Sequence, residues 1–405
     1  MRAAAWLLGF IILFNPYLVP GAESAPRLTD VVGAGLWALL AARLLTGRTL
    51  HLPTLARLGV VVALVLLWAL RDAARAGLAP DVAQVRWILA AAHGYFLWLL
   101  ARGPATRKPL VLGLGWGAVA NLGVVALQGA GMTDLTVALG LASPRFESRW
   151  ALVGGVVEVR PFGMWGHPNA SSGVIALCLP LVLGLVDEGR LGARWIVAGL
   201  GVTFLGSALT LTRSGMLVGA LLLGVWALGG RQTPRQRMAR LSVMLLLAAV
   251  GAAVGPPGGW ERWTDSRTAG NRGERLHATL GSLDLALSNP AGLGAGYGET
   301  LLRTVGIPAT HNAWMYLALL AGLPLALLVL AAVAGHALSL ARRRSVEAWL
   351  ALAMLGLFLF EEYFRATAFQ ILALWLVATP TGLLRGVRVP APAAPAPAAP
   401  NPAAG

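Results

Sequence analysis

The chain has 405 residues, of which 57% are hydrophobic and only 12% are charged. Soluble proteins carry about a quarter charged residues, so this composition excludes a soluble globular protein and favours a polytopic membrane protein. Basic loops between apolar runs explain much of the formal net charge of +15 better than a nucleic-acid partner does. The single cysteine, Cys178, excludes an intrachain disulfide.

Apolar runs of about 20 residues predict one all-α membrane domain over residues 1–388, with about twelve transmembrane helices. The N-terminal run imitates a signal peptide, but further apolar runs follow, so we expect it to be the first span. Residues 389–405 are almost only Pro and Ala and predict a disordered tail. The expected spans are roughly 4–21, 30–47, 55–71, 86–102, 108–129, 163–186, 195–211, 213–229, 238–255, 311–340, 346–361 and 366–384.

Basic residues predict the orientation of these spans. Every short loop on one side carries at least two basic residues, and the positive-inside rule places that side in the cytoplasm. Both termini are then cytoplasmic, and two hydrophilic insertions, 130–162 and 256–310, face outward. Within the second insertion, the leucine spacing from Leu276 to Ser288 predicts an amphipathic helix that lies along the membrane interface.

Residues that could carry chemistry gather on the expected outer side. Pro and Gly break the helix just before the sixth span, and non-helical backbone at this depth is tolerated where it is buried in protein or lines a cavity. Four groups stand out: Arg160 to Asn169, which contains Gly163 and His167; the turn Thr212-Arg213-Ser214-Gly215; the loop segment with Arg272 and Arg275; and His311-Asn312 at the tenth span.

Outward arginines beside a histidine suit an anionic substrate. Guanidinium groups match phosphate oxygens and stay charged, and a histidine near neutral pH can accept a proton from a sugar hydroxyl. A lipid pyrophosphate is a good leaving group once its developing charge is stabilised. The sequence has no Walker loop, HExxH, DxD or GxSxG motif, so we expect metal-independent sugar transfer, with no metal site and no cofactor.

The arginines also have a structural interpretation. Arg213 could extend along the membrane boundary and keep its charge in water. Arg272 and Arg275 could form a solvated loop face.

The histidines and two carboxylates have alternatives too. His167 and His311 could cap helices or satisfy buried carbonyl groups. Glu361 and Glu362 are functional candidates because they lie at a membrane boundary, and pairing with Arg365 explains them equally well.

At these residues the sequence resembles the O-antigen ligase and polymerase superfamily of bacterial membrane glycosyltransferases, from about Arg160 to Leu330. The resemblance rests on G-x-x-x-H-P-N at 163–169, the T-R-S-G turn, the run 275–296 with its N-P-x-G-x-G-x-G ending, and His311-Asn312 followed by Gly322. The histidine-to-glycine spacing resembles a ligase signature. Leu325 and Thr279 depart from the family pattern.

The resemblance implies a C-type glycosyltransferase fold and an O-antigen ligase activity in lipopolysaccharide biosynthesis. Such an enzyme transfers a glycan, with inversion and without a metal, from undecaprenyl pyrophosphate to lipid A–core oligosaccharide at the periplasmic face of the bacterial inner membrane. By position, His311 would be the base, Arg213 and Arg275 would bind the pyrophosphate, and Arg272 would compete for the role of Arg275. Further candidate substrate-binding residues are Arg160, His167, Asn169 and Asn312.

Three other functions stay open. An O-antigen or exopolysaccharide polymerase would use the same donor, with a second lipid-linked repeat unit as acceptor. A polytopic transporter should carry ionisable residues near the middle of its spans, whereas the charges here lie mostly at span ends and in outer loops. A non-catalytic scaffold for polysaccharide export would leave the outer arginines and histidine unexplained.

Overall fold

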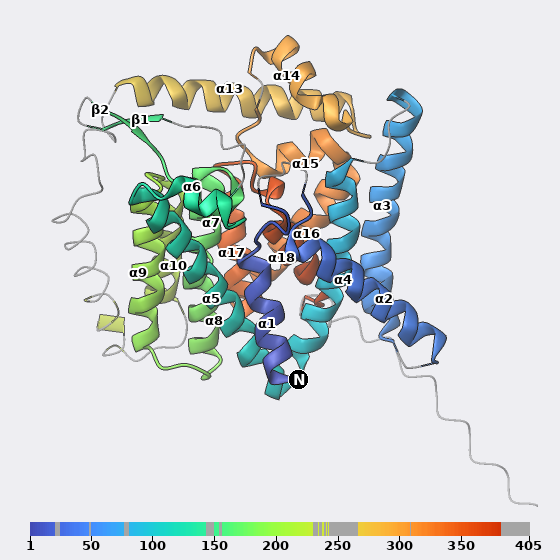
Figure 1. The fold of residues 1–405 in the computed structure, drawn as a ribbon, viewed down its shortest axis with the longest axis vertical. Helices are drawn as coiled ribbons and strands as arrows, with labels where there is room; N and C mark the ends of the chain where they lie inside the picture. The colour runs from blue at the N-terminus through green and yellow to red at the C-terminus, as the bar shows by residue number, and fades with distance from the viewer. Residues whose placement is uncertain are drawn as a thin grey trace, which may run out of the picture.

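The computed structural model describes residues 1–20, 25–47, 50–76, 81–142, 150–153, 156–229, 266–307 and 309–381, with isolated residues between 230 and 242. Within these residues the protein is a helical bundle with one short antiparallel β-hairpin (Figure 1). The predicted tail 389–405 and nearly all of the predicted ninth span, 238–255, lie outside the described residues.

The first half of the chain contributes α1 to α8 and the hairpin. Its elements are α1 (Arg2–Leu13), α2 (Leu28–Leu45), α3 (Leu52–Ala76), α4 (Val82–Arg102), α5 (Pro104–Gly129), α6 (Thr133–Ala138), β1 (Trp150–Val153), β2 (Val156–Val159), the 3₁₀ turn η1 (Gly163–Trp165), α7 (Pro168–Ala176) and α8 (Cys178–Asp187).

The second half completes the bundle and covers one of its ends. Its elements are α9 (Arg194–Leu209), α10 (Ser214–Leu228), α13 (Ser266–Ser288), η2 (Gly294–Gly296), α14 (Tyr297–Val305), α15 (Ala313–Ala321), α16 (Leu323–Ser339), α17 (Val346–Phe358), η3 (Tyr363–Arg365) and α18 (Thr367–Ala378). Figure 1 shows α13 lying across the end of the bundle opposite to the N-terminus.

Four helical stretches among the described residues are long and apolar enough to cross a membrane, judged by length and composition. Six further apolar helices are shorter, at 10–17 residues. Only 17% of Leu28–Leu45 but 78% of Pro168–Asp187 is buried inside the bundle, so the first stretch is peripheral and the second is central. These features support a helical membrane protein. The four long stretches are Leu28–Leu45, Leu52–Arg75, Pro104–Gly129 and Pro168–Asp187.

The predicted sixth span, 163–186, begins with irregular backbone that is satisfied by buried side chains of α5. The amides of Phe162 and Gly163 donate to Oε1 of Gln128, at 3.0 and 2.8 Å. The amide of Met164 donates to Oδ1 of Asn121, at 3.2 Å. Because the side chains of α5 replace water as partners, this break is tolerated inside a bundle, as the sequence suggested.

The predicted tenth span, 311–340, is two helices that meet at Gly322, and the sequence did not indicate this break. Gly322 has φ +106°, a conformation that side-chain-bearing residues rarely adopt. Pro324 follows in the first turn of α16 and has no amide N–H to continue a helix.

Close backbone contacts at glycines hold α1 against α5. A side chain at Gly9 would collide with the carbonyl of Leu110, and one at Gly113 or Gly117 would collide with the backbone of α1. Small residues at such crossings let two helices approach closely, which is a common device in membrane bundles.

The expected amphipathic helix of the outer insertion is part of α13, which begins earlier, at Ser266. The four leucines of its predicted apolar face are exposed, and the face that packs on the bundle is formed mainly by small residues, with Leu285 beside them. The exposed leucines are Leu276, Leu280, Leu283 and Leu287, and the buried residues are Ala278, Ser282 and Ala286.

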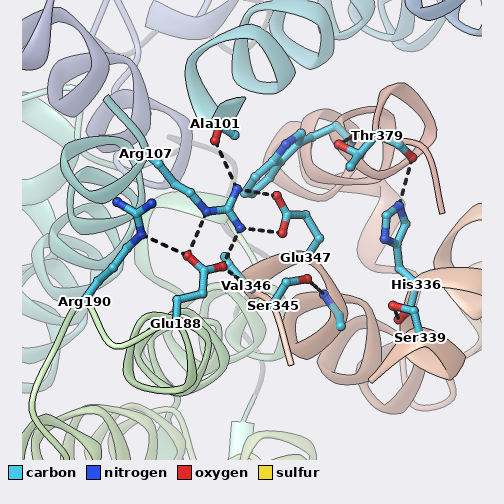
Figure 2. Close-up of polar contacts among 12 residues, drawn as sticks. Ala101, Arg107, Glu188, Arg190, His336, Ser339, Ser345, Val346, Glu347 and Thr379 are labelled. Atoms are coloured by element: carbon cyan, nitrogen blue, oxygen red, sulfur yellow. Dashed lines mark hydrogen bonds and ion pairs between the residues drawn. The ribbon is translucent and has the colours of Figure 1, made fainter. Parts of the chain in front are cut away.

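The two ends of the bundle differ in chemistry. At one end, Arg107 joins Glu188 and Glu347 in an ion cluster, drawn in Figure 2. Glu347 lies in the first turn of α17, and Glu361 follows the last turn of the same helix, so these two carboxylates mark opposite ends. The end that contains Glu361 also holds all four groups of residues singled out in the sequence.

Candidate active site

The N-termini of α7, α10 and α15 meet around residues 361–363. Asn169 in the first turn of α7 contacts Glu361, Ser214 at the start of α10 contacts Tyr363, and His311 precedes α15. Each helix N-terminus carries a partial positive charge of about +0.5. Three such helix ends at one site favour an anionic ligand.

Glu361 connects two of the groups that were separate in the sequence. Asn169 donates a hydrogen bond from Nδ2 to Oε2 of Glu361. Nδ1 of His311 lies 3.8 Å from the other carboxylate oxygen, Oε1. The structure therefore brings His311 beside the segment Arg160–Asn169, with Glu361 between them.

The backbone holds His311 in an uncommon conformation. Its φ is +51°, in the left-handed region, where strain in a non-glycine residue often marks a functional site. Both neighbours are fixed: the amide and hydroxyl of Thr310 donate to Oε1 of Glu362 at 2.7 and 2.9 Å. The side chain of Asn312 accepts hydrogen bonds from the first amides of α15. The backbone on both sides of His311 is therefore held in place, which restricts the positions that its ring can take.

The surroundings of Nδ1 indicate which ring nitrogen of His311 is basic. Nδ1 is buried and makes no hydrogen bond within the part of the chain that the structure describes. The nearest carboxylate is Glu361, and 3.8 Å exceeds a hydrogen bond, so this contact is electrostatic. A carboxylate beside Nδ1 favours the tautomer that carries its proton there, which leaves Nε2 as the basic nitrogen.

Glu361 is ionised across the physiological pH range. Burial would raise the pKa of this carboxyl above its ordinary value of 4.5. The rings of His311 and His167 and the Asn169 amide outweigh burial and lower the pKa to about 2. The site therefore contains a fixed negative charge that can stabilise a protonated histidine.

Arg160, His167 and Asn169 hold one another in place. Nε of Arg160 donates to the carbonyl of Thr210 at 2.9 Å, and Nη2 donates to Oδ1 of Asn169 at 3.0 Å. Nδ1 of His167 accepts the Asn169 amide at 3.1 Å and so caps α7. The structure gives these residues a positioning role, and their contact with substrate stays a prediction.

Tyr363 links the two arginines that were expected to bind pyrophosphate. Arg213 is the half-buried N-cap residue of α10, and the next hydroxyl, Oγ of Ser214, lies 3.0 Å from the phenol of Tyr363. Arg275 is exposed on α13, and its charge acts on the same phenol. Arg275 therefore acts on this site electrostatically, and the residue that follows Arg213 contacts it. The side chain of Arg272 lies outside the described residues.

Glu362 has a structural role that differs from that of Glu361. It pairs with Arg365, with Nη2 to Oε2 at 2.6 Å, as the sequence allowed, and accepts from the phenol of Tyr297 at 3.3 Å. Burial and the Glu362 charge raise the pKa of Tyr297 to about 12, so this phenol stays protonated. The network ties α14 and the loop before His311 to η3.

Sequence reasoning did not find Tyr363 or assign Glu361 to His311. The signal for Glu361 was a pair of carboxylates at a helix end, and two adjacent carboxylates offered no way to choose between them. No protein-family model matches this sequence, and no curated protein matches it. The fold and the site define a helical membrane protein with a histidine–carboxylate pair at one end of its bundle.

Proposed function

We propose that this protein is a membrane glycosyltransferase of the O-antigen ligase type, with about twelve spans and a C-type architecture. It would transfer a glycan from undecaprenyl pyrophosphate to lipid A–core oligosaccharide at the periplasmic face of the bacterial inner membrane. The observation that carries the proposal is His311, which has strained backbone and has Nδ1 directed at the ionised Glu361.

The proposed reaction is a single displacement. The acceptor hydroxyl attacks the anomeric carbon of the glycan, and its proton passes to Nε2 of His311. The bond between the anomeric carbon and the pyrophosphate oxygen breaks, and undecaprenyl pyrophosphate leaves. One displacement inverts the anomeric configuration. The imidazolium that forms is stabilised by Glu361, in the way a buried carboxylate supports a histidine base in other enzymes.

The leaving group requires positive charge, which this end of the bundle can provide without a metal ion. Arg213 and Arg275 would hold the pyrophosphate in planar, forked hydrogen bonds. The N-termini of α7, α10 and α15 add partial positive charge on fixed backbone. Charge that is already in place when the bond breaks stabilises a transition state most effectively.

The sequence pattern favours lipid A–core oligosaccharide as the acceptor. The spacing from His311-Asn312 to Gly322 resembles the ligase signature, and Gly322 forms the break between α15 and α16. A polymerase would use the same donor and the same base with a lipid-linked repeat unit as acceptor, and this second candidate shares every feature of the site.

A transporter is disfavoured by the placement of the charged clusters at the two ends of the bundle. Two histidines, His93 and His336, do lie inside predicted spans. Nδ1 of His93 contacts the carbonyl of Leu89 at 3.1 Å, and Nε2 of His336 contacts the carbonyl of Leu376 at 3.0 Å. Each is therefore engaged by backbone, which is a structural role.

The experiment is glycan transfer by the purified protein in detergent, in the presence of excess EDTA. An undecaprenyl-pyrophosphate glycan is offered with a lipid A–core acceptor or with a second lipid-linked repeat. Product on the core supports the ligase, and a ladder of lipid-linked repeats supports the polymerase. Donor binding without product from either acceptor would refute both.

A further inference from the structure

A short loop, Asn289–Leu293, completes the hydrogen bonds that are broken where α15 meets α16. The amide of Leu323 donates to the carbonyl of Pro290 at 2.8 Å, and the amide of Leu293 donates to the carbonyl of Leu319 at 2.6 Å. In a continuous helix, Leu323 would have donated to Leu319. At this junction the loop therefore supplies the backbone hydrogen-bond partners that a continuous helix would have provided.

One carbonyl at the break still lacks a helical partner. The carbonyl of Leu320 would accept from residue 324 in a continuous helix, but that residue is Pro324, which has no N–H. Arg71, near the end of α3, supplies the donor: its Nη2 bonds the Leu320 carbonyl at 3.2 Å. Its Nη1 donates to the carbonyl of Ala291 in the loop. One guanidinium thus joins α3, the loop and the end of α15.

Asp72 fixes the orientation of this guanidinium. Its Oδ1 accepts from Nε and Nη2 of Arg71 at 3.0 and 2.6 Å. Its Oδ2 accepts from Nε1 of Trp68 at 2.7 Å and from Nε2 of Gln84 at 3.0 Å. A side chain at Gly294 would collide with the same carboxylate. The second glycine of the N-P-x-G-x-G-x-G run is thus a point of close approach to α3.

The loop lies between the two helices that carry the proposed chemistry. It follows α13, which bears Arg275, and it is bonded to α15, whose N-terminus follows His311. The separation between the donor-binding arginine and the base therefore depends on how firmly this junction is held. An error of about 1 Å in such a separation can reduce turnover by about 10²-fold.

We propose that Arg71, oriented by Asp72, is a positioning residue for glycan transfer. Its hydrogen bonds hold the loop that follows α13 against the C-terminal end of α15. They thereby set the distance from the pyrophosphate site to His311. The catalytic part of this inference rests on the proposed function. A lysine at position 71 keeps the charge but not the fork, and it cannot bond both carbonyls and Asp72 together.

The test compares full-length wild-type, Arg71→Lys and Arg303→Ala proteins in detergent. Arg303 is the matched control, because its ion pair with Glu299 on α14 is exposed, with side chains 76% and 68% accessible. Hydrogen exchange is measured at the Leu293 and Leu323 amides, and kcat and the donor KM are measured per mole of donor-binding protein. If Arg71→Lys protein is not recovered, Gln84→Ala, which removes one donor to Asp72, is measured instead.

For Arg71→Lys we expect amide exchange to rise about tenfold or more, and kcat to fall about 10²-fold with a nearly constant donor KM. Arg303→Ala should match wild type in both. Unchanged exchange at both amides would overturn the inference even if no transfer were detected. Raised exchange with unchanged kcat would also overturn it. A wild-type protein that transfers nothing would count against the proposed function, and exchange alone would then decide whether Arg71 locks the junction.

Discussion

Glu361 shows how one carboxylate can organise a site from residues that are far apart in the chain. It accepts a hydrogen bond from Asn169 and faces Nδ1 of His311. Motif spacing could suggest His311 and the arginines as candidates. It could not choose between Glu361 and Glu362, because that choice depends on which direction each side chain takes after α17 ends.

Replacing Glu361 by glutamine should lower kcat by about 10²-fold and leave donor binding intact. The amide has a single acceptor oxygen, so either Asn169 or His311 loses its partner. Since the pKa of Glu361 is about 2, the deficit should be present at every pH from 5 to 9. Transfer rates across this range are the measurement, and a deficit that appears only at one end would contradict the assignment.

The same pKa predicts how stability depends on pH. The folded-state pKa lies below the ordinary 4.5, so the charged carboxylate stabilises the fold above pH 4.5. That contribution is lost as the pH falls towards 2. The difference in melting temperature between wild type and Glu361→Gln should therefore be largest near pH 7 and should shrink below pH 4.

Arg275→Lys should behave like Arg275→Ala, with both donor affinity and turnover reduced about tenfold or more. A lysine supplies a point charge and cannot replace the planar fork on two phosphate oxygens. Binding of a donor analogue and the initial rate of transfer are measured for both variants. Recovery of wild-type values by lysine would show that only charge matters at this position.

At the scale of elements, the ion cluster at the opposite end joins three helices (Figure 2). All five N–H donors of Arg107, on α5, are used: two contact Glu188 after α8, two contact Glu347 on α17, and one contacts the carbonyl of Ala101. The three side chains are only 12%, 15% and 7% exposed. Breaking a buried cluster of this kind leaves uncompensated charge.

We expect Arg107→Met to lower the free energy of unfolding by about 3–5 kcal/mol. The matched variant Arg303→Met breaks an exposed pair and should cost at most about 1 kcal/mol. Equilibrium unfolding in mixed micelles compares the two. Equal costs would mean that solvent or lipid headgroups satisfy the two carboxylates once Arg107 is gone.

Hydropathy located most of the helices but not their interruptions. The apolar run 311–340 predicts one span because its composition is uniform. In the structure, Gly322 and Pro324 divide it into the two helices α15 and α16. The break is stable because the loop from Pro290 to Leu293 and Arg71 replace the missing hydrogen bonds. Those partners are distant in sequence, so hydropathy contains no information about them.

At the scale of the molecule, composition alone could indicate a helical membrane protein, and the structure agrees. The predicted number of spans rests on the apolar runs, and their predicted orientation rests on charge asymmetry. The prediction is that α13 faces the periplasm and that the turn between α16 and α17 faces the cytoplasm.

Cysteine labelling can check this orientation. In a Cys178→Ser background, the exposed positions His277 on α13 and Arg342 between α16 and α17 are each replaced by cysteine. An impermeant maleimide should label position 277 in cells with a permeabilised outer membrane, and position 342 only after the inner membrane is opened. Labelling in the reverse order would invert the topology and place the site in the cytoplasm.

The measurement that bears most directly on the whole account is single-turnover glycan transfer by wild type and His311→Ala, with excess EDTA and with donor binding measured on the same samples. His277→Ala, an exposed change on α13, is the control. We predict product from wild type and from the control, and none from His311→Ala although it binds the donor. Wild-type rates from His311→Ala, or loss of all product on adding EDTA, would contradict a metal-independent reaction with His311 as its base.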